Sequence, residues 1–329
     1  MQILMTEPAY ERVRGRLATL APDAEVVTIA VGETYALAGQ PINVDAVAPE
    51  IVWLTLDSFA SGLTRPLLIG MGRGTLKPKW AQLFNAGLDN PAFKAVMAQG
   101  VRLTRSSSQA ISIAEYVLAH ALSLQFPIEA QAAFQEAHAW KPTPYREIGR
   151  SRWVLIGYGN IGREIARRIK PFGVDLTVVR RHPGDEEFAD RSITQQDLAS
   201  ALPDADVVVL ACALNDDTRG LCNADFFAAM KPGSILINIG RGGLVDEDAL
   251  KAGLDRDQPG RAVLDVFATE PLPTDSWFWD HPKVRVSAHT SNSGDGNVGR
   301  GDELFLDNLS RYLAGHPLLN EADRSEVGL

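Results

Sequence analysis

The chain has 329 residues, of which 45% are hydrophobic and 22% are charged, and its formal net charge is −9. A chain of this length and composition can bury a core large enough for two domains, so we expect a globular α/β protein. The acidic balance argues against a surface that binds nucleic acid or an anionic membrane, because both partners favour a basic face.

The beginning of the chain lacks the basic segment and long apolar run of a signal peptide. No apolar run reaches the ~20 residues that a membrane-spanning helix needs. There are only two cysteines, Cys212 and Cys222, and Cys212 stands at the end of an expected core strand. We therefore expect a cytoplasmic protein with reduced thiols, no disulfide framework and no metal site.

The first hundred residues alternate short apolar runs with amphipathic segments. This alternation predicts a parallel, wound sheet. A last helix, expected over residues 297–314, could return to this part of the chain. We therefore expect a discontinuous substrate-binding domain made of residues 1–110 and 296–329. Its expected strands are residues 2–5, 26–29, 51–56, 80–85 and 102–104, and its expected helices are residues 7–20 and 91–99.

A long apolar helix is expected over residues 113–124, and a connection rich in aromatic residues and prolines follows over residues 125–150, with Trp140 and Tyr145 among them. A connection of this length often has a role of its own. Two interpretations stay open: an arm that packs on a second subunit, or an extended helix and loop on its own domain.

An apolar run ending in GxGxxG is the strongest motif of the chain. It predicts a strand, a tight turn and a helix start, and a second apolar strand over residues 174–179 completes a βαβ unit. The first glycine allows the turn, the second lets the backbone approach a pyrophosphate, and the third lets the helix pack closely on the strand. We predict a dinucleotide site formed by Gly157, Tyr158, Gly159, Asn160, Ile161 and Gly162.

Arg180 and Arg181 stand at the end of the second strand, where chains that bind NAD usually place Asp or Glu. Guanidinium groups bind a 2′-phosphate through charge-assisted hydrogen bonds, whereas a carboxylate would repel it. We therefore predict a preference for NADP(H) over NAD(H). The alternative is that both arginines are surface charges that contact only solvent.

From Trp153 onward the pattern of a second wound sheet continues, with six expected strands. They predict a Rossmann-type dinucleotide-binding domain over residues 111–295. The expected fold is thus α/β, with two wound parallel-sheet domains and a cleft between them. The strands are expected over residues 153–156, 174–179, 207–210, 234–239, 262–265 and 284–287, and the helices over residues 163–170, 194–201, 224–230 and 247–254.

Three ionisable residues, Arg241, Glu270 and His289, follow three consecutive expected strands of this sheet. The carboxyl ends of parallel strands share one edge, where ligands bind, so these residues should gather near the nicotinamide. His289 can exchange a proton near neutral pH, and Glu270, bonded to its other ring nitrogen, would favour the imidazolium form. Arg241 can clamp a substrate carboxylate with two hydrogen bonds. Together they suit the reduction of a 2-oxo acid.

Several motifs carry a resemblance to a known family. They are residues 237–247 (INIGRGGLVDE), residues 264–267 with 270–273 (LDVF and EPLP), residues 85–89 (NAGLD), and Ala288 with His289. Over nearly the whole chain, the sequence resembles D-2-hydroxyacid dehydrogenases. The arginine pair makes it similar to the NADP-dependent glyoxylate and hydroxypyruvate reductase branch.

The resemblance implies that Arg241, Glu270 and His289 are the catalytic residues, with His289 as acid and base, and that the protein is a homodimer. It also implies that Asp265 approaches the nicotinamide carboxamide. Backbone N–H groups of Ala86, Gly87 and Leu88 would hold the substrate carboxylate. Further cofactor contacts are implied at Cys212, Ala213, Thr218 and Ile239.

The chain departs from the family pattern in places. Ala213 and Ala288 stand where prolines are common, and Trp277 and Trp279 bring bulky rings that could wall the substrate pocket or pack at a subunit edge. We predict an NADPH-dependent reductase of glyoxylate or hydroxypyruvate. The alternatives are a dehydrogenase for a bulkier 2-oxo acid, such as an aryl-pyruvate, and a non-enzymatic dinucleotide sensor.

Overall fold

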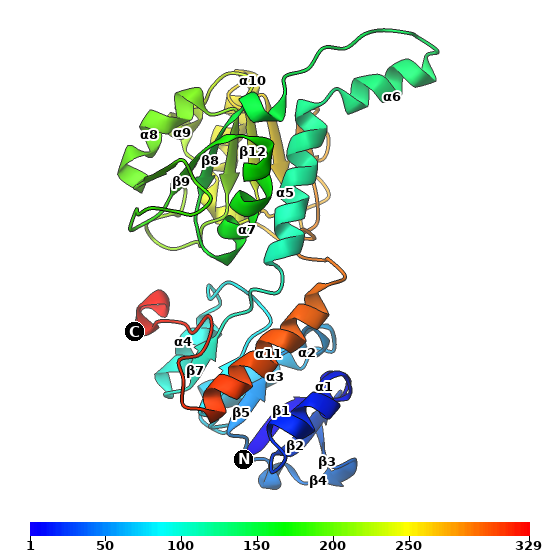
Figure 1. Ribbon diagram of the computed structural model, residues 1–329, viewed down its shortest axis with the longest axis vertical. Helices are drawn as coiled ribbons and strands as arrows, with labels where there is room; N and C mark the ends of the chain where they lie inside the picture. Colours follow the sequence, from blue (N-terminus) through cyan, green and yellow to red (C-terminus); the bar gives the residue numbers. More distant parts are fainter. The chain divides into compact units, whose positions relative to one another are not determined.

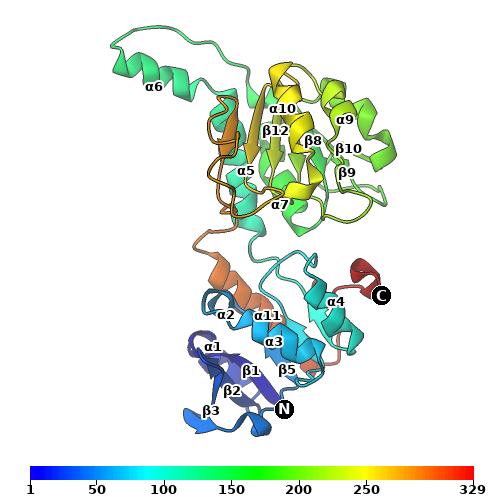
Figure 2. The ribbon, with the colours of Figure 1, turned by 180° about the vertical axis from the view of Figure 1, so that it is seen from behind.

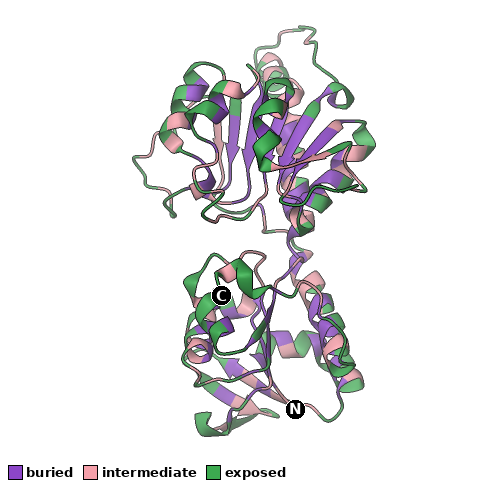
Figure 3. Cartoon of the chain, turned by 90° about the vertical axis from the view of Figure 1, so that its left-hand side faces the viewer, coloured by how far each residue is buried: buried purple, intermediate pink, exposed green.

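The computed structural model describes residues 1–329. The chain divides into two compact units, one made of residues 1–109 and 295–329 and the other of residues 110–294. Each unit holds one seven-stranded sheet with helices on both of its faces (Figure 1). The strands of both sheets are largely buried, whereas the outer faces of the helices are exposed (Figure 3).

The sheet of the first unit has the order β4-β3-β2-β1-β5-β6-β7. Helices α1 (Glu7–Leu20) and α11 (Asn297–Leu313) cover one face, and α3 (Thr64–Gly72) and α4 (Pro91–Ala98) cover the other. The strands are β1 (Gln2–Thr6), β2 (Glu25–Ala30), β3 (Thr34–Leu37), β4 (Gln40–Ile42), β5 (Ile51–Trp53), β6 (Trp80–Gln82) and β7 (Arg102–Thr104).

This sheet is not wholly parallel, which corrects the prediction. β3 runs antiparallel to both β2 and β4. The reason is local: Ala38 and Gly39, which connect β3 to β4, have φ values of 49° and 75°. Two successive positive φ values are typical of a type I′ hairpin turn, which reverses the chain within two residues.

Two expected strands of the first unit are shorter than predicted. The strand expected over residues 51–56 ends at Trp53, because Thr55 caps the short helix α2 (Leu56–Ala60). Its hydroxyl accepts from the backbone N of Ser58 at 3.2 Å, and the Ser58 hydroxyl accepts from the backbone N of Thr55 at 3.0 Å. This capping box starts a helix where the apolar pattern continues. The strand expected over residues 80–85 likewise ends at Gln82.

The sheet of the second unit is fully parallel, with the order β10-β9-β8-β11-β12-β13-β14. It has seven strands where six were predicted. The additional strand, β10, is a partly exposed edge of three residues and has no apolar run to reveal it. The strands are β8 (Arg152–Ile156), β9 (Asp175–Val179), β10 (Arg191–Ile193), β11 (Val207–Leu210), β12 (Ile235–Asn238), β13 (Arg261–Leu264) and β14 (Val284–Val286).

Two sets of helices bury the faces of the second sheet. α5 (Ala110–Gln125) and α7 (Asn160–Ile169) pack on one face. α8 (Leu198–Ala201), α9 (Ala224–Ala229) and α10 (Glu247–Asp255) pack on the other, and the last two are seen from that side in Figure 2. The helix expected over residues 194–201 is α-helical only in α8, since residues 195–197 form a 3₁₀ turn.

A segment that extends away from the second unit follows α5. It begins with α6 (Ile128–Glu136), in which no residue is buried, and residues 137–147 then run without regular structure. Trp140 in this segment is 99% exposed. No single helix of the chain is long and apolar enough to cross a membrane. Only α5 and α6 taken together, with a 57° bend between them, reach the necessary length and hydropathy.

Candidate active site

The glycines after β8 have the geometry that a dinucleotide site requires. Gly157 has φ +103°, and a Cβ there would lie 2.6 Å from backbone atoms of Ala211 and Cys212. A Cβ on Gly162 would lie 2.2 Å from the Gly157 carbonyl oxygen, so both positions exclude a side chain. Around Gly159, by contrast, nothing lies within 4 Å of a Cβ. The backbone at the second glycine is therefore open to a ligand.

The start of α7 continues this cradle. Gly159 is the N-cap of the helix, and no side chain caps it. The N–H groups of a helix's first turn and its partial positive charge favour a phosphate. The residues present thus fit a bound dinucleotide, with Tyr158 buried in the turn and Asn160 and Ile161 in the first turn of the helix.

The loop after β11 lies beside the glycine turn, as the approach of Gly157 to Ala211 and Cys212 shows. Thr218 closes this loop: its hydroxyl donates to the Ala213 carbonyl at 2.7 Å. Burial raises the pKa of Cys212 to about 11, so its side chain is a neutral thiol at physiological pH. Ile239, which follows β12, is buried. The contacts of these residues with a cofactor stay a prediction.

The two arginines after β9 differ in their surroundings. Arg180 donates to a carboxylate oxygen of Glu186, and its guanidinium lies 5.9 Å from the centroid of the Tyr158 ring. Arg163, in α7, lies 6.0 Å from the same ring. Arg181 is exposed and makes no hydrogen bond or ion pair. Only Arg180 is therefore held in place by the protein itself.

The structure brings the three expected catalytic residues to one edge of the second sheet. They follow β12, β13 and β14, which are neighbours in that order. His289 Nδ1 lies 2.8 Å from Glu270 Oε2, and the other Glu270 oxygen accepts from the backbone N of Phe267 at 2.9 Å. Both side chains are partly exposed, at 41% for His289 and 36% for Glu270. The imidazole Nδ1 thus bonds a carboxylate, and Nε2 takes no part in that hydrogen bond.

The neighbouring loop carries Arg241 and contacts the segment that leads to Glu270. A Cβ on Gly242 would lie 1.8 Å from the carbonyl carbon of Phe267, so the two backbones touch and only glycine fits. Arg241 Nη1 donates to the Gly240 carbonyl at 2.8 Å. This close approach joins the loop that carries Arg241 to the segment between β13 and Glu270.

Asp265 anchors the loop that carries His289. It is fully buried, and its carboxylate accepts from the backbone N of Thr290 at 2.8 Å and of Ser291 at 3.0 Å. Its own carbonyl accepts from the backbone N of His289 at 2.8 Å. The φ of His289 is 51°, a left-handed conformation that persists only where neighbouring contacts hold it. A direct contact of Asp265 with the nicotinamide stays a prediction.

Two residues that sequence reasoning missed complete this anchor. The Ser287 hydroxyl donates to Asp265 Oδ1 at 2.5 Å, so the Tyr116 hydroxyl, 2.6 Å from Ser287 Oγ, must donate to Ser287. Burial is the main cause that raises the pKa of Tyr116 to about 12, which keeps this donor protonated. No sequence motif marks Tyr116, because its partner lies 171 positions away.

The expected carboxylate-binding loop lies in the first unit, after β6. Ala86, Gly87 and Leu88 are all half-buried, and Asn85 Nδ2 donates to the Gly87 carbonyl, which fixes the shape of the loop. The structure thus leaves the backbone of this loop partly accessible.

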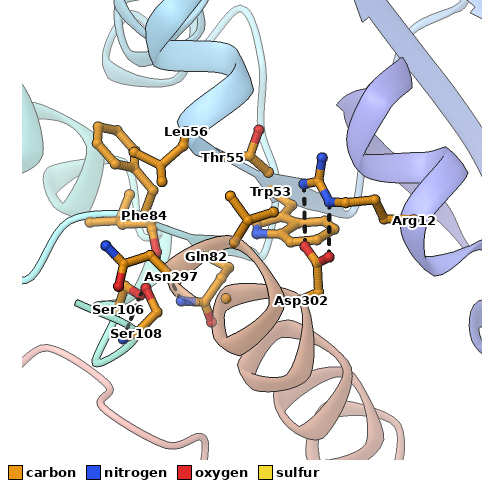
Figure 4. A pocket seen from close by; sticks show the side chains of 13 residues that line it. Arg12, Trp53, Thr55, Leu56, Gln82, Phe84, Ser106, Ser108, Asn297 and Asp302 are labelled. Carbon is orange, nitrogen blue, oxygen red and sulfur yellow. Dashed lines mark hydrogen bonds and ion pairs between the residues drawn. The ribbon is translucent and has the colours of Figure 1, made fainter. Parts of the chain in front are cut away.

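A cavity of about 30 Å³ lies at the carboxyl ends of β5, β6 and β7 (Figure 4), and some of its lining residues directly precede this loop in the sequence. Leu83 and Phe84 line it, together with Trp53, and the ion pair between Arg12 and Asp302 forms one side at 2.9 Å. Burial raises the pKa of Asp302. No sequence motif marks Arg12 or Asp302, which come from helices α1 and α11, far apart in the chain.

The other aromatic candidates lie elsewhere. Phe278 is buried against Phe267 in the core of the second unit, and Trp277 packs against that core. Trp279 is half exposed, and its indole N–H donates to the Pro273 carbonyl at 2.8 Å. These rings pack on their own unit.

Comparisons with known proteins identify the family of the chain. Residues 118–291 match the NAD binding domain of the D-isomer specific 2-hydroxyacid dehydrogenases. The chain is 34% identical over 255 residues to the glyoxylate reductase/hydroxypyruvate reductase of Mus musculus, covering 74% of this chain and 75% of that protein. It is also 34% identical over 232 residues to D-3-phosphoglycerate dehydrogenase of Mycobacterium bovis, covering 70% of this chain and 44% of that protein.

Among solved structures, a D-isomer specific 2-hydroxyacid dehydrogenase from Xanthobacter autotrophicus, in complex with NADPH and MES, is similar over 99% of both chains, with 25% identity and a TM-score of 0.76. The family match covers more than half of the chain, and the fold agrees along its whole length. The chain therefore belongs to the D-isomer specific 2-hydroxyacid dehydrogenase family, a family of oxidoreductases that use a nicotinamide cofactor and act on small 2-hydroxy and 2-oxo acids.

Proposed function

We propose that this protein reduces a small 2-oxo acid of the glyoxylate or hydroxypyruvate type to the D-2-hydroxy acid, with NADPH as the reductant. One observation carries the proposal: His289 and Glu270 are hydrogen-bonded at 2.8 Å beside the Arg241 loop, on the sheet that bears the dinucleotide turn. The names of similar proteins support the substrate class, and the NADPH complex of the Xanthobacter autotrophicus relative supports the cofactor.

In this proposal the cofactor supplies a hydride to the carbonyl carbon, and the chain's own residues position and protonate the substrate. Arg241 binds the substrate carboxylate through two hydrogen bonds and polarises the adjacent carbonyl. Protonated His289 donates from Nε2 to the carbonyl oxygen, since its Nδ1 already bonds Glu270. The resemblance to the family also assigns the backbone N–H groups of Ala86, Gly87 and Leu88 to binding of a substrate carboxylate.

The test is the initial rate of NADPH oxidation with glyoxylate, hydroxypyruvate and phenylpyruvate, with NADH run in parallel. We expect fast oxidation of NADPH with the two small acids and slow oxidation of NADH. Phenylpyruvate as the best substrate would replace the substrate class by a bulky one. If protein shown to bind NADPH turns over none of the three acids, the proposal fails, and a sensor becomes the better account.

Charge reversal at Arg180 tests the cofactor preference. In Arg180→Asp the group expected at the 2′-phosphate becomes a carboxylate, which repels the phosphate and can bond a ribose hydroxyl. We expect kcat/KM for NADPH to fall by about 10²-fold while that for NADH falls much less. The matched control is Arg181→Asp, at the exposed neighbour. An unchanged ratio of the two cofactors in Arg180→Asp would show that Arg180 contacts no phosphate.

Removing the charge of Glu270 tests the pair with His289. Glu270 Oε2 lies 2.8 Å from His289 Nδ1 and orients the imidazole, whose Nε2 is the proposed proton donor. In Glu270→Gln we expect kcat for reduction to fall by about 10²-fold, because an amide holds the ring less firmly in this orientation than a carboxylate does. The measurement is steady-state kcat with saturating NADPH and glyoxylate. An unchanged kcat would contradict an orienting role of Glu270.

We also propose that the segment of α6 and residues 137–147 packs on a second copy of this chain. α6 buries none of its residues on its own unit, and Trp140 is 99% exposed. Apolar side chains extended in this way are typical of an interface between subunits. Sedimentation should give a dimer for the wild type and a large fraction of monomer for Trp140→Asp combined with Ile128→Asp. A monomeric wild type would contradict the proposal.

A further inference from the structure

A short acidic segment, Asp185-Glu186-Glu187, folds back onto the arginines near the dinucleotide turn. Glu186 accepts from Arg180, and Glu187 Oε2 lies 3.7 Å from Arg163 Nη2. The two acids differ in burial, because the Glu186 side chain is 8% exposed and the Glu187 side chain 66%. The Glu186 carboxylate is thus largely withdrawn from water although the Arg180 side chain is 36% exposed, whereas the Glu187 pair is at the surface.

The pair of Arg180 and Glu186 lies where the adenosine end of a dinucleotide is expected. Arg180 ends β9, the second strand of the βαβ unit, and this strand end is where such sites contact the ribose. The guanidiniums of Arg180 and Arg163 both lie against the ring of Tyr158, which belongs to the glycine turn itself. The carboxylate of Glu186 therefore bonds the cation that a 2′-phosphate would need.

We infer that Glu186 competes with the 2′-phosphate for Arg180 and thereby limits the preference of this protein for NADP(H) over NAD(H). This inference rests on the cofactor preference proposed above. A phosphate monoester carries a charge of about −1.5 to −2 at pH 7 and cannot share Arg180 with a buried carboxylate without repulsion. Binding of NADP(H) must therefore break the ion pair and move Glu186 toward solvent.

NAD(H) brings no second anion to this strand end, so the Arg180–Glu186 pair persists when NAD(H) binds. The cost of separating the pair falls on the phosphorylated cofactor alone. Glu186 should consequently weaken the binding of any ligand with a 2′-phosphate and leave its unphosphorylated counterpart unchanged. The opposite role, in which Glu186 orients Arg180 for the phosphate, predicts weaker phosphate binding when the carboxylate is removed.

The experiment measures binding to the full-length protein by calorimetry, with adenosine 2′,5′-bisphosphate and adenosine 5′-monophosphate as probes. The variants are Glu186→Gln, which keeps the shape of the side chain, and Glu186→Ala as a second replacement. Glu187→Gln is the matched control, because it removes an adjacent carboxylate that is exposed and pairs with a different arginine. Thermal unfolding of each variant checks that the fold is retained.

We expect Glu186→Gln and Glu186→Ala to bind the bisphosphate about tenfold more tightly than the wild type, which corresponds to about 1.4 kcal/mol. Binding of the monophosphate should change less than about twofold, as should both affinities in Glu187→Gln. Weaker bisphosphate binding in the Glu186 variants would overturn the inference in favour of an orienting role. Equal changes for the two probes would overturn it as well, because the effect would then not depend on the 2′-phosphate.

The same data separate this inference from the proposed cofactor preference. If wild-type protein binds both probes equally but Glu186→Gln favours the bisphosphate, the preference proposal fails and the competition stands. If the wild type strongly favours the bisphosphate and Glu186→Gln does not differ from it, the preference stands and the competition fails.

Discussion

In His289→Ala we expect kcat for the reduction of a 2-oxo acid to fall by about 10²–10⁴-fold, the usual contribution of a positioned acid. The imidazole is hydrogen-bonded to Glu270, and alanine leaves no group at this position that can deliver a proton at neutral pH. The measurement is single-turnover oxidation of NADPH with glyoxylate, which isolates the chemical step.

Cofactor binding provides the control for His289→Ala. The dinucleotide turn lies after β8, and the Arg180–Glu186 pair follows β9, so neither depends on the imidazole. NADPH affinity should stay within about twofold of the wild-type value. Turnover close to that of the wild type would exclude His289 as the proton donor and would remove the central element of the proposed function.

Arg241→Ala should have a comparably large effect through a different parameter. In the proposed mechanism, removing the guanidinium removes a two-pronged hydrogen bond to the substrate carboxylate and the polarisation of the neighbouring carbonyl. We expect kcat/KM for glyoxylate to fall by about 10³-fold, with a marked rise in KM, whereas His289→Ala acts mainly on kcat. Steady-state kinetics across a wide range of glyoxylate concentrations distinguish the two.

Arg241→Lys is the matched variant. Lysine keeps the positive charge but loses the planar fork, so its activity should lie between those of the wild type and Arg241→Ala. Arg241 also donates to the Gly240 carbonyl, so thermal unfolding must confirm that the loop is retained. If Arg241→Ala keeps its KM for glyoxylate, the guanidinium does not bind the substrate carboxylate.

Local signals predicted much of the secondary structure. α1 spans Glu7–Leu20, β7 spans Arg102–Thr104 and β11 spans Val207–Leu210, as the apolar pattern indicates. These elements are recognisable because the helix buries one stripe of side chains and the strands bury their side chains in the sheet. Buried positions are occupied by apolar residues, so the burial appears as a pattern in the sequence. β3, β4 and β10 were missed because they are partly exposed strands of three or four residues, at a sheet edge or, for β3, next to one, and such short strands show no clear apolar pattern.

By itself, the sequence determined the family, the dinucleotide turn and which residue types follow each strand of the second sheet. The spacing of the glycines and the order of the strands can both be read directly along the chain. The contact of Glu270 with His289 was also expected from the order of the strands, and the structure contains it. Tertiary structure alone decided the donor chain from Tyr116 to Asp265 and the pairing of Arg180 with Glu186, which depend on how loops close over a sheet edge. Such contacts are selected by burial and geometry between distant segments, and no periodicity along the chain encodes them.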